Sequence, residues 1–253
     1  MDLQLRGKHA VVTGASQGIG LAVATLLAEE GCDLTLVARN RTSLQNAADQ
    51  IAAVAHAVPR LIVADLSLPG AIDELAKEVT SLDILVNNAG AIPPGGLLDI
   101  SSERWRGAWD LKVYGYIDLT RSLYPLLTVS RGVVVNIIGT AGERPDPSYI
   151  AGAAGNSALM AFTKGMAKGA AVDGVRVVGI NPGPVRTERI KLMLRNQAER
   201  KLGDAERWPE LVANMPFGRM AEPQEIAQAV AFLASPLSAY TSGAILTIDG
   251  GGA

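Results

Sequence analysis

The segment Thr13-Gly14-Ala15-Ser16-Gln17-Gly18-Ile19-Gly20 follows the apolar run 9–13 and precedes a helical pattern over 19–30. Glycines at these positions permit a tight turn, let the backbone approach a ligand and let the helix pack on the strand. The first N–H groups of the helix have no intrahelical partners, and the helix dipole favours an anion beside them. The segment therefore predicts a pyrophosphate site, with a tight strand–helix junction as the alternative. The expected binding residues are Gly14, Ser16, Gln17, Gly18, Ile19 and Gly20.

Short apolar runs alternate with helical patterns along the rest of the chain. The expected strands are 9–13, 33–38, 61–64, 84–86, 132–138, 175–180 and 244–248, and helical patterns include 19–30, 42–54, 71–79 and 222–234. The runs are continuously apolar, as expected for parallel strands covered on both faces. This order predicts a single-domain α/β fold over 1–253, with a doubly wound parallel sheet and right-handed crossovers.

The region 187–217 departs from this alternation because it is polar, helical and rich in charge. A long insertion between the last two strands often covers the ligand crevice of an α/β enzyme. We expect a substrate loop or lid here. The alternative is a solvated pair of helices that covers the sheet edge.

Composition excludes several classes of protein. The chain has 253 residues, 48% hydrophobic, and 23 Lys and Arg against 25 Asp and Glu, which excludes disorder and argues against nucleic-acid binding through a basic field. A single cysteine, Cys32, forms no internal disulfide or thiolate metal cluster, and His9 and His56 lie far from the motifs, so no metal site is expected. The amino terminus lacks the pattern of a signal peptide, and no apolar run is long enough for a membrane span. These features predict a soluble cytoplasmic protein.

Arg39 bears on the choice of dinucleotide. The second strand ends at Ala38-Arg39, where an acidic residue would accept hydrogen bonds from the ribose 2′-hydroxyl of NAD. Arg39 is instead placed to pair with a 2′-phosphate, so NADP(H) is favoured and NAD(H) remains possible. The alternative is a surface arginine at a strand end. Further polar segments follow other strands, at Asp65-Leu66, Asn87–Gly90 and Asn181–Thr187.

With these motifs in order, the chain resembles the short-chain dehydrogenase/reductase superfamily over nearly its whole length. The matching segments are Thr13–Gly20, Asn87–Gly90, Asn181–Thr187 and Asp249-Gly250-Gly251. The resemblance implies a seven-stranded Rossmann-type sheet, NAD(P)(H) binding and a homodimer or homotetramer. It also implies that Asp65 binds adenine and that Thr187 and the Pro182-Gly183 backbone hold the nicotinamide end. The further expected cofactor contacts are Leu66, Asn87, Ala89, Gly90 and Val185.

The catalytic segment departs from the pattern of most members, which carry a Ser and a Tyr-x-x-x-Lys. An ungapped match places Gly139 at the Ser, Gly152 at the Tyr and Asn156 at the Lys, while Lys112 falls on an Asn of the preceding helix. The segment with Tyr149 and, seven positions later, Asn156 locally resembles divergent enoyl-acyl carrier protein reductases, which use Tyr-x6-Lys. Because residues i and i+3 share a helical face, the Tyr149 hydroxyl can reach the space left by Gly152.

These residues suggest a non-standard active site. We expect Tyr149 to donate a hydrogen bond or proton, Asn156 to bind the nicotinamide ribose, and Lys112 to supply positive charge. The alternatives are a tyrosine that packs the helix start, an interface amide and a solvated lysine. The sequence thus predicts an NAD(P)(H)-dependent oxidoreductase that uses NADPH to reduce a small carbonyl or conjugated enone substrate. The alternative function is a cofactor-binding scaffold or sensor that has lost hydride chemistry.

Overall fold

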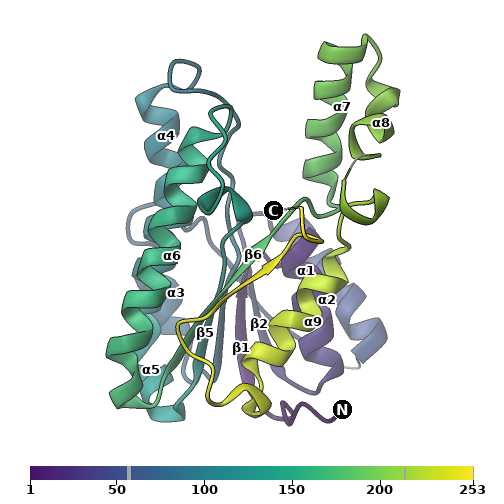
Figure 1. Cartoon of the computed structure of the whole chain (residues 1–253). Coiled ribbons are helices and arrows are strands. Elements are labelled where there is room, and N and C mark those ends of the chain that lie inside the picture. The colour runs from purple at the N-terminus through teal and green to yellow at the C-terminus, as the bar shows by residue number, and fades with distance from the viewer. Residues whose placement is uncertain (56–57, 214, 253) are drawn as a thin grey trace.

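The computed structural model describes residues 1–55, 58–213 and 215–252, which form one parallel sheet of seven strands flanked by helices (Figure 1). The strands are β1 (His9–Thr13), β2 (Asp33–Ala38), β3 (Arg60–Val63), β4 (Ile84–Asn87), β5 (Val133–Ile137), β6 (Arg176–Pro182) and β7 (Ile245–Ile248). Their order is β3-β2-β1-β4-β5-β6-β7, so the direction of winding reverses between β1 and β4. The structure confirms the predicted single-domain doubly wound fold, and each predicted strand is found within two residues of its expected bounds.

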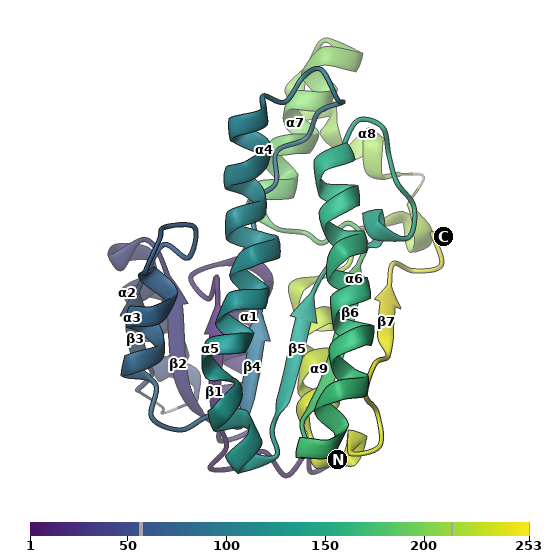
Figure 2. The ribbon, with the colours of Figure 1, turned by 90° about the vertical axis from the view of Figure 1, so that its left-hand side faces the viewer.

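Helices cover both faces of the sheet. One face carries α1 (Gly18–Glu29), α2 (Arg41–Ala55) and α9 (Pro223–Ala234), and the other carries α3 (Ala71–Glu78), α5 (Gly115–Ser130) and α6 (Ile150–Ala170). Figure 2 shows α5 and α6 in front of the sheet, with α1 and α9 behind it. Successive strand residues alternate between the two cores, as Val134 and Val135 do in β5. Burial on both faces explains why the strands are continuously apolar.

Further helices stand at the carboxyl end of the sheet. They are α4 (Ser102–Trp109), the π-helical segment η1 (Asp110–Tyr114), α7 (Glu188–Leu202) and α8 (Trp208–Val212). Short 3-10 turns lie at Thr140–Gly142, Ala171–Asp173, Ala205–Arg207, Pro216–Gly218 and Pro236–Ser238. In Figure 1, α4 rises on one side of the strand ends, and α7 and α8 rise on the other. Within the described ranges, no helix is long and apolar enough to cross a membrane.

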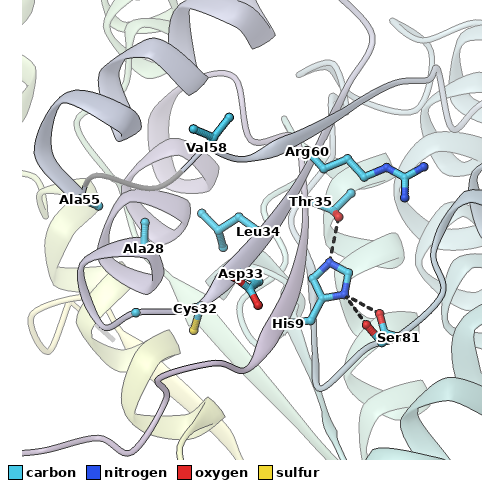
Figure 3. A pocket seen from close by; sticks show the side chains of 11 residues that line it. His9, Ala28, Cys32, Asp33, Leu34, Thr35, Ala55, Val58, Arg60 and Ser81 are labelled. Carbon is cyan, nitrogen blue, oxygen red and sulfur yellow. Dashed lines mark hydrogen bonds between the residues drawn. The ribbon is translucent and has the colours of Figure 1, made fainter.

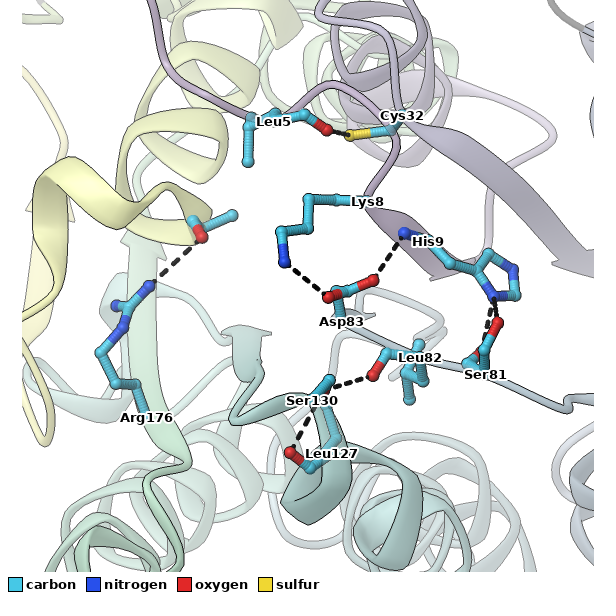
Figure 4. Close-up of polar contacts among 11 residues, drawn as sticks. Leu5, Lys8, His9, Cys32, Ser81, Leu82, Asp83, Leu127, Ser130 and Arg176 are labelled. Atoms are coloured by element: carbon cyan, nitrogen blue, oxygen red, sulfur yellow. Dashed lines mark hydrogen bonds and ion pairs between the residues drawn. The ribbon is translucent and has the colours of Figure 1, made fainter.

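The amino end of the sheet holds a separate polar cavity of about 590 Å³ (Figure 3). There His9 lies between two neighbours, with its Nε2 2.9 Å from Thr35 Oγ1 and its Nδ1 facing Ser81. Burial raises the pKa of the Cys32 thiol to about 12, and this thiol faces the Leu5 carbonyl (Figure 4). The cavity is at the opposite end of β1 from the glycine turn, so it is not the cofactor site. His56 is outside the described residues.

Candidate active site

The glycine turn after β1 leaves no room for side chains at its key positions. Gly14 has a φ of +64°, and a Cβ there would lie 2.9 Å from Asn88 Nδ2. Gly18 has a φ of +56°, and a Cβ there would lie 3.1 Å from Thr187 Cγ2. A Cβ on Gly20 would overlap the Gly14 carbonyl. The turn therefore needs glycine both for its backbone conformation and for close packing against the ends of β4 and β6.

The amino end of α1 is open toward the same space. Gln17 occupies the N-cap position in an extended conformation, yet its side chain makes no capping hydrogen bond, and the first turn carries no acidic residue. Ser16 and Ile19 are half-buried beside it. Uncapped N–H groups at the positive end of a helix fit a phosphate group. The residues present therefore fit the pyrophosphate of a dinucleotide.

The ends of β2 and β3 bring a cation and a carboxylate together. Arg39 is exposed directly after β2, and Asp65 follows β3. The pKa of Asp65 is lowered mainly by the hydrogen bond from Ser67 Oγ, 2.6 Å away, while burial opposes this and the Arg39 charge adds to it. Leu66 is buried next to Asp65. The two charged side chains therefore lie near each other, at the sheet edge where the adenosine half is expected.

The first residues of the segment after β4 hold neighbouring elements of the sheet together, and the last one lies toward the site. The buried Asn87 amide donates to Asn136 Oδ1 at 2.9 Å and to Thr120 Oγ1 at 3.0 Å, which ties β4 to β5 and α5. The Ala89 backbone N–H donates to Thr13 Oγ1, so the ends of β1 and β4 are held together. Gly90 continues from there toward the catalytic segment.

The segment after β6 is anchored on both sides. The Gly183 N–H donates to the Ile248 carbonyl at 2.9 Å, and Val185 is buried and bridged to Ala221. Thr187 caps α7, with its Oγ1 accepting from the Ile190 N–H at 3.3 Å. The structure thus places Pro182, Gly183, Val185 and Thr187 in one fixed segment whose last residue touches Gly18.

Tyr149 lies at the start of α6, and its ring covers Gly152. Tyr149 is the N-cap of α6, so it precedes the helix, and its ring folds back onto the first turn. A Cβ on Gly152 would overlap this ring and would lie 2.6 Å from the Tyr149 hydroxyl. The phenol therefore occupies the space that a side chain at position 152 would take. Burial raises the pKa of Tyr149, and the charge of Arg189 lowers it.

Asn156 fills the space beside Gly139. It is 2% exposed, its Nδ2 donates to the Gly139 carbonyl at 3.3 Å, and a Cβ on Gly139 would lie 2.9 Å from Nδ2. Among the described residues, nothing hydrogen-bonds to the buried Asn156 Oδ1. A buried oxygen without a hydrogen-bond donor destabilises the folded state, so this atom is suited to accept a hydrogen bond from a ligand hydroxyl.

Lys112 points into the site from the π-helical segment between α4 and α5. Its Nζ donates to the Ile138 carbonyl at 2.6 Å, and its Cδ lies 3.0 Å from where a Cβ on Gly90 would be. Burial, and then the charge of Arg189, lower the pKa of Lys112 to about 7. The residue as a whole is half-buried and its ammonium is held by the Ile138 carbonyl, which disfavours the alternative of a solvated lysine.

The structure adds Arg189, which the sequence analysis did not single out. Arg189 lies in the first turn of α7 and donates from Nη1 to the Gly90 carbonyl at 2.9 Å and from Nη2 to the Ile92 carbonyl at 2.7 Å. Its place two residues after Thr187, next to a strand-end segment, is the only signal of this role in the sequence.

Comparisons with known proteins identify the family of the chain. A family model described as Enoyl-(Acyl carrier protein) reductase matches residues 14–252. The 3-oxoacyl-(acyl-carrier-protein) reductase of Vibrio cholerae is 34% identical over 253 residues, which cover 98% of both chains. The chain belongs to the short-chain dehydrogenase/reductase (SDR) superfamily. As an SDR it is an NAD(P)-dependent oxidoreductase.

Solved SDR structures share the whole fold. L-sorbose reductase from Gluconobacter frateurii, complexed with NADPH and L-sorbose, has a TM-score of 0.93 at 30% identity and covers 99% of this chain and 98% of its own. A 7α-hydroxysteroid dehydrogenase complexed with NADH has a TM-score of 0.88 at 28% identity, covering 99% and 96%. These relatives support a nicotinamide cofactor for this SDR, and between them they contain both NADPH and NADH.

Proposed function

We propose that this SDR uses NADPH to reduce a carbonyl or conjugated enone through a rebuilt active site. The observation that carries the proposal is the Tyr149 phenol, which fills the space above Gly152, where the superfamily pattern has its tyrosine. A bound nicotinamide cofactor supplies the hydride. The chain must then supply the substrate oxygen with a proton and hold the substrate in place.

Tyr149 is suited to the proton-donating role. Because burial raises its pKa, the phenol stays protonated at neutral pH. A protonated phenol donates to a carbonyl or enolate oxygen during reduction but is a poor base for oxidation. Tyr149 packs against an apolar cluster whose buried members are Ile92, Ile100, Ala108 and Ala151, and this cluster covers one side of the site.

Asn156 and Lys112 complete the proposed site. The free Asn156 Oδ1 accepts a hydrogen bond from a nicotinamide ribose hydroxyl, while its Nδ2 stays on Gly139. Lys112, with a pKa of about 7, holds or releases a proton at neutral pH and can therefore return a proton to the site. Both residues deliver their polar atoms to the carboxyl end of β5, at Ile138 and Gly139.

We infer that NADPH is preferred over NADH because Arg39 is exposed where the 2′-phosphate is expected. A charge-assisted hydrogen bond contributes about 1.5–3 kcal/mol, so Arg39→Ala should weaken NADPH binding by roughly 10- to 100-fold and leave NADH binding nearly unchanged. Fluorescence titration with both cofactors measures this, with Lys77→Ala, an exposed cation on α3, as the control. Equal loss of both cofactors would contradict the assignment.

We further infer that 187–217 serves as the lid and that the chain assembles into a homodimer or homotetramer. α7 begins directly after Thr187 and is fastened across the site by Arg189, which supports the first inference. An apolar groove between α5 and α6, lined by Ile117, Tyr124, Phe162 and Met166, supports the second.

Replacing Tyr149 with Phe tests the proposed function. NADPH oxidation should be followed with a panel of ketones and cyclic enones, and the product of each enone should be identified. An allylic alcohol indicates carbonyl reduction, and a saturated ketone indicates reduction of the double bond. Tyr149→Phe should lower kcat by about 10²-fold or more, whereas Tyr240→Phe, at a fully exposed ring, should leave it unchanged. Unchanged turnover in Tyr149→Phe would remove the proposed role.

A further inference from the structure

The proposed reaction leaves a negative charge on Tyr149 that needs a positive neighbour. After the phenol gives up its proton, a phenolate remains against the apolar cluster of Ile92, Ile100 and Ala151, surroundings that stabilise an anion poorly. Asn156, at the position of the usual lysine, is neutral. Lys112 is an unreliable cation because its pKa of about 7 makes it lose its charge as the pH rises past neutrality.

Arg189 meets this need with a charge that does not titrate. A guanidinium stays protonated throughout the physiological range. The two hydrogen bonds to the Gly90 and Ile92 carbonyls fix Arg189 over the loop after β4. Ile92 packs in the same cluster as Tyr149, and the Gly95 N–H donates to the Ser148 carbonyl at 2.7 Å, so this loop is attached to the tyrosine segment.

The charge of Arg189 is also left unneutralised. The ion pairs found among residues 1–55, 58–213 and 215–252 do not include Arg189. Two acidic side chains on the segments attached to Tyr149 have other partners: the Asp146 carboxylate accepts from Ser148, and Asp99 accepts from the Gly96 N–H. The other charged groups on the elements around the ring are Glu103, Arg104 and Arg106 on α4, Asp110 and Lys112 on η1, Lys164 and Lys168 on α6, and Glu188, Lys191, Arg195, Glu199, Arg200 and Lys201 on α7.

We propose that Arg189 is a positioning residue that supplies the positive charge for Tyr149 and carries it on the first turn of α7. This inference rests on the proposed role of Tyr149 as proton donor. Because α7 belongs to the proposed lid, the charge reaches Tyr149 when the helix is docked on the Gly90–Ile92 backbone. The cation has moved from the usual lysine position on α6 to an arginine on a different element.

The test is a titration of Tyr149 itself. A difluorotyrosine placed at position 149, whose fluorines make the phenol more acidic, is titrated by ¹⁹F NMR in the presence of saturating NADP⁺. Arg189→Gln should raise the titration midpoint by about one pH unit, because an opposite charge nearby lowers the pKa of an acid. Arg189→Met is a second neutral variant with the same expectation, should the glutamine variant not fold. Arg189→Lys, which keeps the charge, should shift the midpoint less.

Lys201→Gln is the matched control, since it removes a cation from the far end of α7 and should leave the midpoint in place. An unchanged midpoint in Arg189→Gln or Arg189→Met overturns the assignment, whatever their turnover. In turnover assays, Arg189→Gln should lower kcat and move the alkaline limb of the pH profile upward, which a purely structural tether would not do. Full activity of Tyr149→Phe would instead overturn the proposed function, so the two failures are distinguishable.

Discussion

Gly152→Ala should displace the Tyr149 ring and remove most activity while leaving the chain folded. The added methyl group would overlap the ring and stand 2.6 Å from its hydroxyl, so the ring must leave its position. Overpacking typically costs about 1–3 kcal/mol, and replacing glycine by alanine in the first turn of a helix recovers at most about 1 kcal/mol. The net loss of stability should therefore be about 0–2 kcal/mol. Loss of a positioned proton donor should lower kcat by about 10²-fold or more.

Gly165→Ala provides the matched control in the same helix. Gly165 is also in α6, but a Cβ there meets nothing within 4 Å. This variant should gain about 0.5–1 kcal/mol and keep its kcat. Urea unfolding and NADPH oxidation, measured on both variants, separate the effect on the ring from the effect on the helix. If Gly152→Ala matched Gly165→Ala in both measurements, the reasoning about the Tyr149 ring would be refuted.

Two further predictions concern buried cations. Arg176 donates to the carbonyls of Leu233, Ala234 and Ser235 at the end of α9 and to that of Thr241 farther along the chain, so Arg176→Met should lower the free energy of unfolding by about 2 kcal/mol in urea, and no loss would contradict this. The pKa of Lys112 falls from 10.5 to about 7 on folding, so the unfolded state binds more protons between these values and the contribution of Lys112 to stability rises with pH. Lys112→Met lacks this dependence, so the free energy of unfolding of the variant relative to the parent should be greatest below pH 7 and should decline at higher pH. If urea unfolding gave a constant difference in this free energy across the pH range, the lowered pKa of Lys112 would be contradicted.

The fold could be predicted because its signals are local. β5 is buried along its whole length, which matches its apolar residues, and its one polar member, Asn136, is paired with the Asn87 and Thr163 side chains. Gly14 had to be glycine because its φ is positive. The placement of Tyr149 near Gly152 followed from helical spacing, although the helix begins one residue later than that argument assumed. Arg189 was missed because its partners are backbone carbonyls 97 and 99 positions away, and a backbone acceptor leaves no mark in the sequence. The lowered pKa of Lys112 could not be predicted from the sequence either, because it depends on burial by segments that meet only in the folded chain.

Two changes in the catalytic segment are matched by side chains that fill the spaces they leave, which supports the proposed function over a loss of hydride chemistry. The space at Gly152 is filled by the Tyr149 ring, and the space at Gly139 is filled by the Asn156 amide. A site released from selection would be expected to accumulate cavities or unpaired charges, and both are costly in a protein interior. Here the enclosed Lys112 ammonium retains an acceptor in Ile138, and the single orphaned atom of the group, Asn156 Oδ1, is one that a ribose hydroxyl would satisfy. Each of the two glycines is matched to the side chain that fills its space, so restoring the usual residue at one of them alone, as with Gly139→Ser, should lower activity rather than raise it.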